Sequence, residues 1–95
     1  MGIDYKKQFI FDPDIFIMSI RYAIGRTTYA SISVIDNIKA NIDFFPTNKL
    51  KIILRDVKED LEVYREYLWD CDVQTWENFI EWLEAVINER MENGK

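Results

Sequence analysis

The strongest constraint on the fold is an apolar stripe at helical spacing in the second half of the chain. Its members recur every three or four residues and are Leu50, Ile53, Leu54, Val57, Leu61, Tyr64 and Leu68. The residues between them are largely charged, so the segment predicts an amphipathic helix with one face in a core and the other in solvent. Such a helix is stable only when other apolar faces pack against it.

Three further segments carry the same period. Asp12 and Pro13 predict the start of a first helix, which is expected to end at Gly25. A second helix is expected over residues 28–44, with Ile32, Ile35, Ile38 and Ile42 as its buried stripe. The last helix is expected to follow a cap at Asp72, and its stripe consists of Val73, Trp76, Phe79, Ile80, Leu83, Val86 and Ile87. Short connections between these segments predict an all-α fold, a compact bundle of about four helices.

The domain organisation follows from the length and from the first helix. A chain of 95 residues is close to the size at which one hydrophobic core suffices without disulfides or metals. We expect residues 1–11 to form an irregular N-terminal arm and residues 12–95 to form a single helical domain. The first helix is apolar on more than one face, through Ile15, Ile17 and Met18, which is consistent with a central position or with a homodimer interface.

The inventory of reactive side chains is poor. The chain has no histidine, and its single cysteine, Cys71, lies between Asp70 and Asp72, which disfavour a thiolate. We therefore expect no enzyme activity, no cofactor and no metal site. No apolar run reaches the roughly 20 residues that a membrane-spanning helix needs. Together with the single cysteine, this predicts a cytoplasmic protein that does not bind membranes.

Residues 21–29, with the sequence Arg-Tyr-Ala-Ile-Gly-Arg-Thr-Thr-Tyr, are the best candidate for a ligand site. A helix that begins after Gly25 would present free N–H groups beside two guanidinium groups, a set that suits a phosphate, and the tyrosine rings could stack on a base. The predicted ligand is a nucleotide-like small molecule. The candidate residues are Arg21, Tyr22, Arg26, Thr27, Thr28, Tyr29 and Arg55. The alternative is an ordinary corner in which Arg21 or Arg55 pairs with Asp56 or Asp36.

The charges are divided unevenly along the chain and indicate a second candidate surface. Residues 1–55 carry a net charge of +3 and residues 56–95 a net charge of −8. Trp82 lies six residues after Trp76 and is expected to turn away from the core stripe. With the neighbouring acids Glu77, Glu81 and Glu84, which the helical pattern places in solvent, it predicts a partner-binding patch suited to a basic groove on a protein.

Direct DNA binding is not expected. Two helices meet at a glycine turn, as in a helix-turn-helix motif, but the helix after the turn carries only Lys39 as a basic residue. Phosphate contacts and base readout would therefore be weak.

Residues 21–29, followed by Ile53-Leu54-Arg55-Asp56, Cys71-Asp72 and Trp76, resemble small uncharacterised proteins of phages and prophages of Gram-positive bacteria. The resemblance covers most of residues 15–85. It implies a non-catalytic binding protein in the host bacterial cytoplasm. Such a protein would antagonise an anti-phage defence system by sequestering a nucleotide ligand. Two alternatives stay open. One is an acidic, anti-CRISPR-like inhibitor that mimics nucleic acid and blocks a nuclease through its C-terminal half; the other is a structural or accessory phage protein.

Overall fold

The computed structural model describes residues 14, 18, 20, 23, 24 and 28–93. Residues 28–93 form three α-helices, α3 (Thr28–Ala40), α4 (Thr47–Tyr64) and α5 (Asp70–Glu92), and two short 3₁₀ helices, η1 (Ile42–Phe44) and η2 (Arg65–Tyr67). The five described residues before position 28 are also helical. The all-α class is confirmed. The predicted arm, the turn at Gly25 and most of the predicted first helix lie outside the described residues, so the structure shows three of the four predicted helices.

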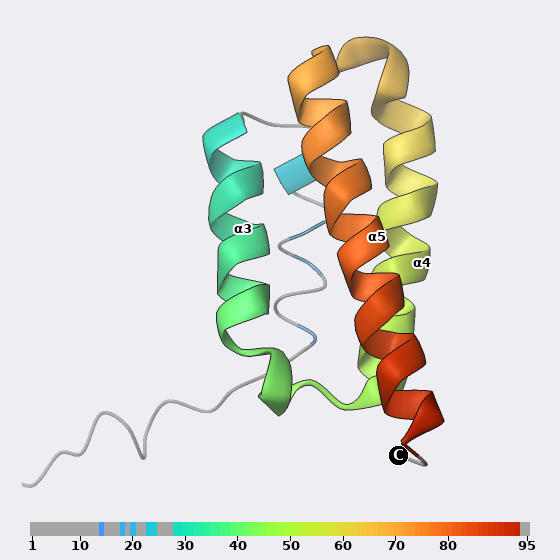
Figure 1. Cartoon of the computed structure of the whole chain (residues 1–95). Helices are drawn as coiled ribbons and strands as arrows, with labels where there is room; N and C mark the ends of the chain where they lie inside the picture. Colours follow the sequence, from blue (N-terminus) through green and yellow to red (C-terminus); the bar gives the residue numbers. More distant parts are fainter. Residues whose placement is uncertain (1–13, 15–17, 19, 21–22, 25–27, 94–95) are drawn as a thin grey trace, which may run out of the picture.

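The central element among the three helices is α5. It packs against α4 and against α3, whereas α3 and α4 have few direct contacts. Figure 1 shows α5 between the other two, with α4 antiparallel to it and α3 running in the same direction as α5. The described residues before α3 lie behind this layer and contribute Ile20, Ala23 and Ile24 to the core.

The core confirms most of the predicted stripes of the last two helices, but Tyr64, at the end of α4, is 39% exposed. Its fully buried members on α4 and α5 are Leu50, Ile53, Val57, Leu61, Trp76, Phe79 and Leu83. The stripe of α3 differs by one position, because Ser31 is 2% exposed while Ile32, which was expected in the core, is 45% exposed. The buried positions of α3 are therefore 31, 35 and 38, at spacings of four and three.

A chain of hydrogen bonds explains why a serine occupies a core position. The Trp76 Nε1–H donates to Ser31 Oγ over 3.1 Å, and the Ser31 hydroxyl donates to the Ala23 carbonyl over 3.4 Å. A tryptophan that is completely buried needs an acceptor for its indole N–H. Ser31 supplies that acceptor, and the two bonds link α5, α3 and the segment before α3.

The ends of the helices differ from the predicted ones. α3 ends at Ala40, and residues 42–44 form η1 instead of continuing the helix. Phe45 is extended, as expected of a residue before proline, but Pro46 itself occupies the cap position of α4, so neither Thr47 nor Asn48 caps that helix. α5 begins at Asp70 and reaches Glu92. The predicted cap at Asp72 is thus wrong, since this residue lies inside the first turn.

Arg90, in the last turn of α5, holds the connection between α3 and α4. Its Nη2 donates to the Ile42 carbonyl over 2.8 Å, and its Nη1 donates to the Phe45 carbonyl. Both bonds are charge-assisted, and they satisfy carbonyl groups where the backbone leaves regular helix. The C-terminal end of α5 is thereby tied to the turn that positions the start of α4.

Candidate functional site

The structure places little of the predicted nucleotide site. Arg21, Tyr22, Arg26 and Thr27 lie outside the described residues, and Thr28 is the first residue of α3. The Tyr29 side chain is described and is 86% exposed in the first turn of α3. Its ring is accessible for stacking, but no described contact joins it to Arg55.

Arg55 is engaged with a neighbour on its own helix. Its Nε and Nη2 donate to Asp56 Oδ1 over 3.2 Å and 3.1 Å, and the Asp56 side chain is largely buried while that of Arg55 is exposed. The ordinary-corner alternative included this Arg55–Asp56 pair, and the pair is confirmed. The guanidinium thus already stabilises a buried carboxylate, which reduces its availability to a ligand.

A groove of about 590 Å³ lies between α4 and α5. It is lined by Lys58, Leu61, Glu62, Arg65, Gln74, Glu77, Ile80 and Glu81. Leu61 is buried and Ile80 is partly buried against the core, whereas most of the other lining side chains are exposed. We call this surface the α4–α5 groove. It combines an apolar base with charged walls, as protein-binding surfaces do.

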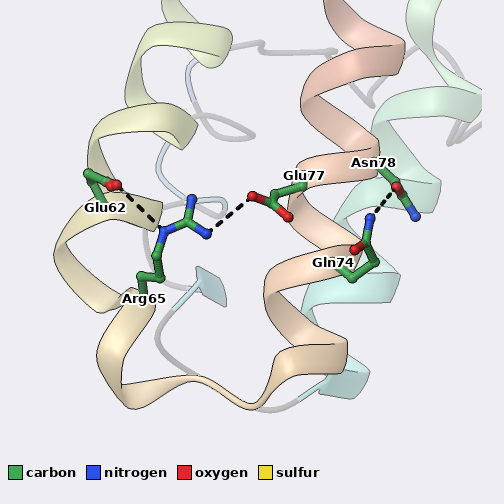
Figure 2. A network of polar contacts seen from close by, with 5 residues as sticks. All are labelled: Glu62, Arg65, Gln74, Glu77 and Asn78. Atoms are coloured by element: carbon green, nitrogen blue, oxygen red, sulfur yellow. Dashed lines mark hydrogen bonds and ion pairs between the residues drawn. The ribbon is translucent and has the colours of Figure 1, made fainter.

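Ion pairs cross the α4–α5 groove. Figure 2 shows Arg65 between two carboxylates, with Nη1 at 3.1 Å from Glu77 Oε2 and Nε at 3.5 Å from Glu62 Oε1. Next to the groove, Lys58 Nζ lies 2.8 Å from Glu84 Oε2. Two of the acids predicted for partner binding therefore also connect α5 to its neighbours, Glu77 to η2 and Glu84 to α4. The pattern of α5 alone could not show this, because it does not contain the bases of α4 and η2.

Glu81 differs from these two acids. It is exposed, lines the α4–α5 groove and forms no ion pair with any described residue. It lies about one turn after Glu77 and one turn before Glu84 on the same helix. The carboxylate of Glu81 is thus the groove acid most available to an incoming cation.

Trp82 does not turn away from the core, so this part of the prediction is wrong. It is partly buried against the core, its ring stacks on Phe79 with centroids 5.9 Å apart, and Lys39 Nζ of α3 lies 5.2 Å from its ring centroid. Trp82 therefore faces α3, while the α4–α5 groove lies on the other flank of α5. Because α5 packs against helices on both flanks, residues beside its main stripe are covered as well.

Trp69 and Tyr67 are exposed aromatic residues that were not among the predicted site residues. Tyr67 is 79% exposed and Trp69 is 74% exposed in the connection between α4 and α5. Their position in a short connection, between two helices with clear stripes, was the available indication, since neither residue fits a stripe.

Comparisons with known proteins return no relatives: no family model matches the chain, and neither do curated proteins or solved structures. Within residues 28–93 and the described positions before them, no helix is long and apolar enough to cross a membrane. The same residues include no group of three or more histidine, cysteine, aspartate or glutamate side chains placed to hold a metal ion.

Proposed function

We propose that this protein is a non-catalytic, phage-type binding protein that antagonises a bacterial defence system by occupying a basic surface of a host protein through the α4–α5 groove. The observation that carries the proposal is the groove itself, with its apolar base and with Glu77 and Glu81 of α5 in its wall. The resemblance of residues 15–85 to phage and prophage proteins supports the setting.

The charge of the C-terminal half favours a cationic partner. Residues 56–95 carry a net charge of −8, and this part of the chain includes the second half of α4 and all of α5. A field of one sign attracts a basic surface over a distance and repels phosphate groups. The groove bases Lys58 and Arg65 are each paired with a glutamate, so they add little attraction for an anion.

The row of acids on α5 also supports mimicry of nucleic acid. Glu77, Glu81 and Glu84 follow one another at about one turn, which spaces their carboxylates roughly 4.5–6 Å apart along the helix axis. A basic groove that binds backbone phosphates meets a comparable series of carboxylates on this helix, of which Glu77 and Glu84 also pair with Arg65 and Lys58. The partner class that fits is a nucleic-acid-binding protein, such as a defence nuclease.

The test is phage plating on bacteria that carry a defence system and express this protein, with a panel of defence systems compared. We expect the wild-type chain to restore plating against at least one system and Glu81→Lys to abolish that restoration. Placing like charges at the centre of an interface costs several kcal/mol. Glu81 has no ion pair with a described residue, so its reversal removes no ion pair within the described part of the chain.

The matched control is Glu89→Lys, an identical charge change at an exposed position two turns further along α5 and outside the groove. Glu89→Lys is expected to restore plating as the wild-type chain does. Equal activity of the two variants would contradict a role for the groove. If no defence system in the panel responds to the wild-type chain, the structural or accessory alternative gains support.

The nucleotide-binding corner stays a second proposal, favoured by one observation. The Tyr29 ring is exposed in the first turn of α3, beside the end of a helix that can attract phosphate. In the same plating assay this proposal makes the opposite prediction. Arg26→Ala should abolish restoration while Glu81→Lys leaves it unchanged.

A further inference from the structure

The connection between α4 and α5 exposes aromatic rings at one end of the helical pair. Tyr67 of η2 and Trp69, just before α5, are mostly exposed, and Tyr64 at the end of α4 is 39% exposed. This connection forms the upper end of the molecule in Figure 1. Large exposed rings on one short connection indicate a binding surface, because a partner that covers them removes much apolar area from water.

The backbone that carries these rings is held in place. The Trp69 carbonyl accepts hydrogen bonds from the N–H groups of Asp72 and Val73, both over 3.0 Å, so its main chain belongs to the start of α5. Leu68, directly before it, is partly buried and packs against the core. The connection thus presents its aromatic side chains from a fixed backbone, which lowers the entropy cost of binding.

The rings are accompanied by two exposed acids. Glu66 and Asp70 are exposed, and neither forms an ion pair with a described residue. The base of this connection, Arg65, is already paired with Glu62 and Glu77. We call Tyr64, Glu66, Tyr67, Trp69 and Asp70 the aromatic end.

We propose that the aromatic end binds an arginine-bearing protein surface. A guanidinium group is planar, so it stacks on the face of an indole or phenol ring while its N–H groups reach neighbouring carboxylates. Tyr67 and Trp69 supply the rings, and Glu66 and Asp70 supply the carboxylates. Arginine, tyrosine and tryptophan are also the residues that dominate binding energy at protein interfaces.

The same charges disfavour the other occupants of an aromatic surface. Stacked bases would bring their phosphates close to Glu66 and Asp70, and anionic lipid headgroups would be repelled in the same way. A second copy of the chain would bring two acidic surfaces together across a two-fold axis. Only a cationic partner gains from both the rings and the carboxylates.

The inference shares with the proposed function the expectation of a cationic protein partner, but it uses none of the residues that line the α4–α5 groove. Each surface can therefore fail in its test without affecting the other. Loss of plating in Glu81→Lys reports on the groove, and the experiment below reports on the aromatic end.

The experiment is a titration followed through the indole N–H signals of the three tryptophans by NMR. The probe is a 12-residue peptide of alternating arginine and serine, and the comparison peptide replaces each arginine with lysine. We expect the Trp69 signal to shift with the arginine peptide, at an affinity about threefold or more above that for the lysine peptide. Trp76, which is buried and bonded to Ser31, provides an internal reference.

Two variants test whether the response depends on the rings of the aromatic end. Tyr67→Ser should weaken the response of Trp69 to the arginine peptide, whereas Phe44→Ser, which removes an exposed ring in η1 at the other end of the helices, should leave it unchanged. Equal shifts with the arginine and lysine peptides, or equal effects of the two variants, would overturn the proposal. The proposal would also be overturned if the Trp69 signal did not respond to the arginine peptide but shifted on raising the protein concentration, or on adding single-stranded DNA or anionic vesicles.

Discussion

Ser31 is a buried polar residue whose hydroxyl forms two hydrogen bonds in the described core. Its hydroxyl accepts a hydrogen bond from the Trp76 indole N–H and donates one to the Ala23 carbonyl. Trp76 also meets Phe79 edge to face, with centroids 5.9 Å apart. The orientation of the largest core side chain is therefore fixed by one polar contact and one aromatic contact.

Ser31→Ala should lower the free energy of unfolding by about 1–3 kcal/mol, because it leaves the buried indole N–H of Trp76 without an acceptor. The matched control is Ser33→Ala, an exposed position two residues further along α3, for which we expect a change within about 0.5 kcal/mol. Urea unfolding monitored by circular dichroism measures both. Equal stability of the two variants would show that the Trp76 contact contributes little.

At this scale the sequence predicts most of the buried residues of α4 and α5, since their stripes are long and regular. It misassigns Ser31 and Ile32 because apolar character alone cannot show that a buried indole needs a polar neighbour. It misassigns Trp82 because burial on the flank of α5 depends on where α3 lies. Both errors concern contacts between helices, which a pattern within one helix does not contain.

Among the elements, the connection between α3 and α4 depends on a residue far away in the chain. Arg90 of α5 bonds to the Ile42 and Phe45 carbonyls, at a point where η1 and the extended Phe45 interrupt the helical hydrogen-bond pattern. Phe45 itself is buried in the core. Phe45 thus fixes the connection in two ways: its side chain packs in the core, and its carbonyl accepts a hydrogen bond from Arg90.

Arg90→Ala should lower the free energy of unfolding by about 1.5–3 kcal/mol, the usual range for hydrogen bonds to a charged group. Arg90→Lys keeps the charge but cannot reach both carbonyls as a planar group does, so an intermediate loss is expected. Hydrogen exchange should accelerate at the Phe45 amide, which donates to the Ile42 carbonyl. The control is Asn88→Ala, exposed on the same helix, and a similar effect of that variant would contradict the assignment.

The existence of α3, α4 and α5 could be predicted, but their ends could not be fixed. Trp69 and Pro46 occupy the cap positions without a side-chain cap, so the usual preference for serine, threonine, asparagine or aspartate was misleading. The α4–α5 groove could not be predicted from the sequence for a related reason. The acids were predicted on α5, whereas Lys58 and Arg65, which pair with Glu84 and Glu77, belong to α4 and η2.

At the scale of the whole molecule, the described residues before α3 share one core with the three helices. Ile20, Ala23 and Ile24 are almost completely buried, and Lys49 of α4 forms an ion pair with Asp14. The segment before α3 is therefore part of the packed structure at these positions. Its removal would expose apolar surface of the other helices.

Ile24→Ala should cost about 2–5 kcal/mol of unfolding free energy, as expected for a large-to-small change in a core. Met18→Ala, in the same segment but 71% exposed, is expected to change it by less than about 0.5 kcal/mol. The measurement is thermal or urea unfolding followed by both tryptophan fluorescence and circular dichroism. Non-coincident transitions in the Ile24 variant would show that the segment does not unfold together with α3, α4 and α5.

The central place of α5 has a consequence for the biosynthesis of the protein. A ribosome releases α3 and α4 before α5, and each of these helices packs mainly against α5. Until α5 emerges, the parts of their apolar faces that α5 covers stay available to chaperones or to other nascent chains. The described core is therefore completed only after α5 has left the ribosome and packed against α3 and α4.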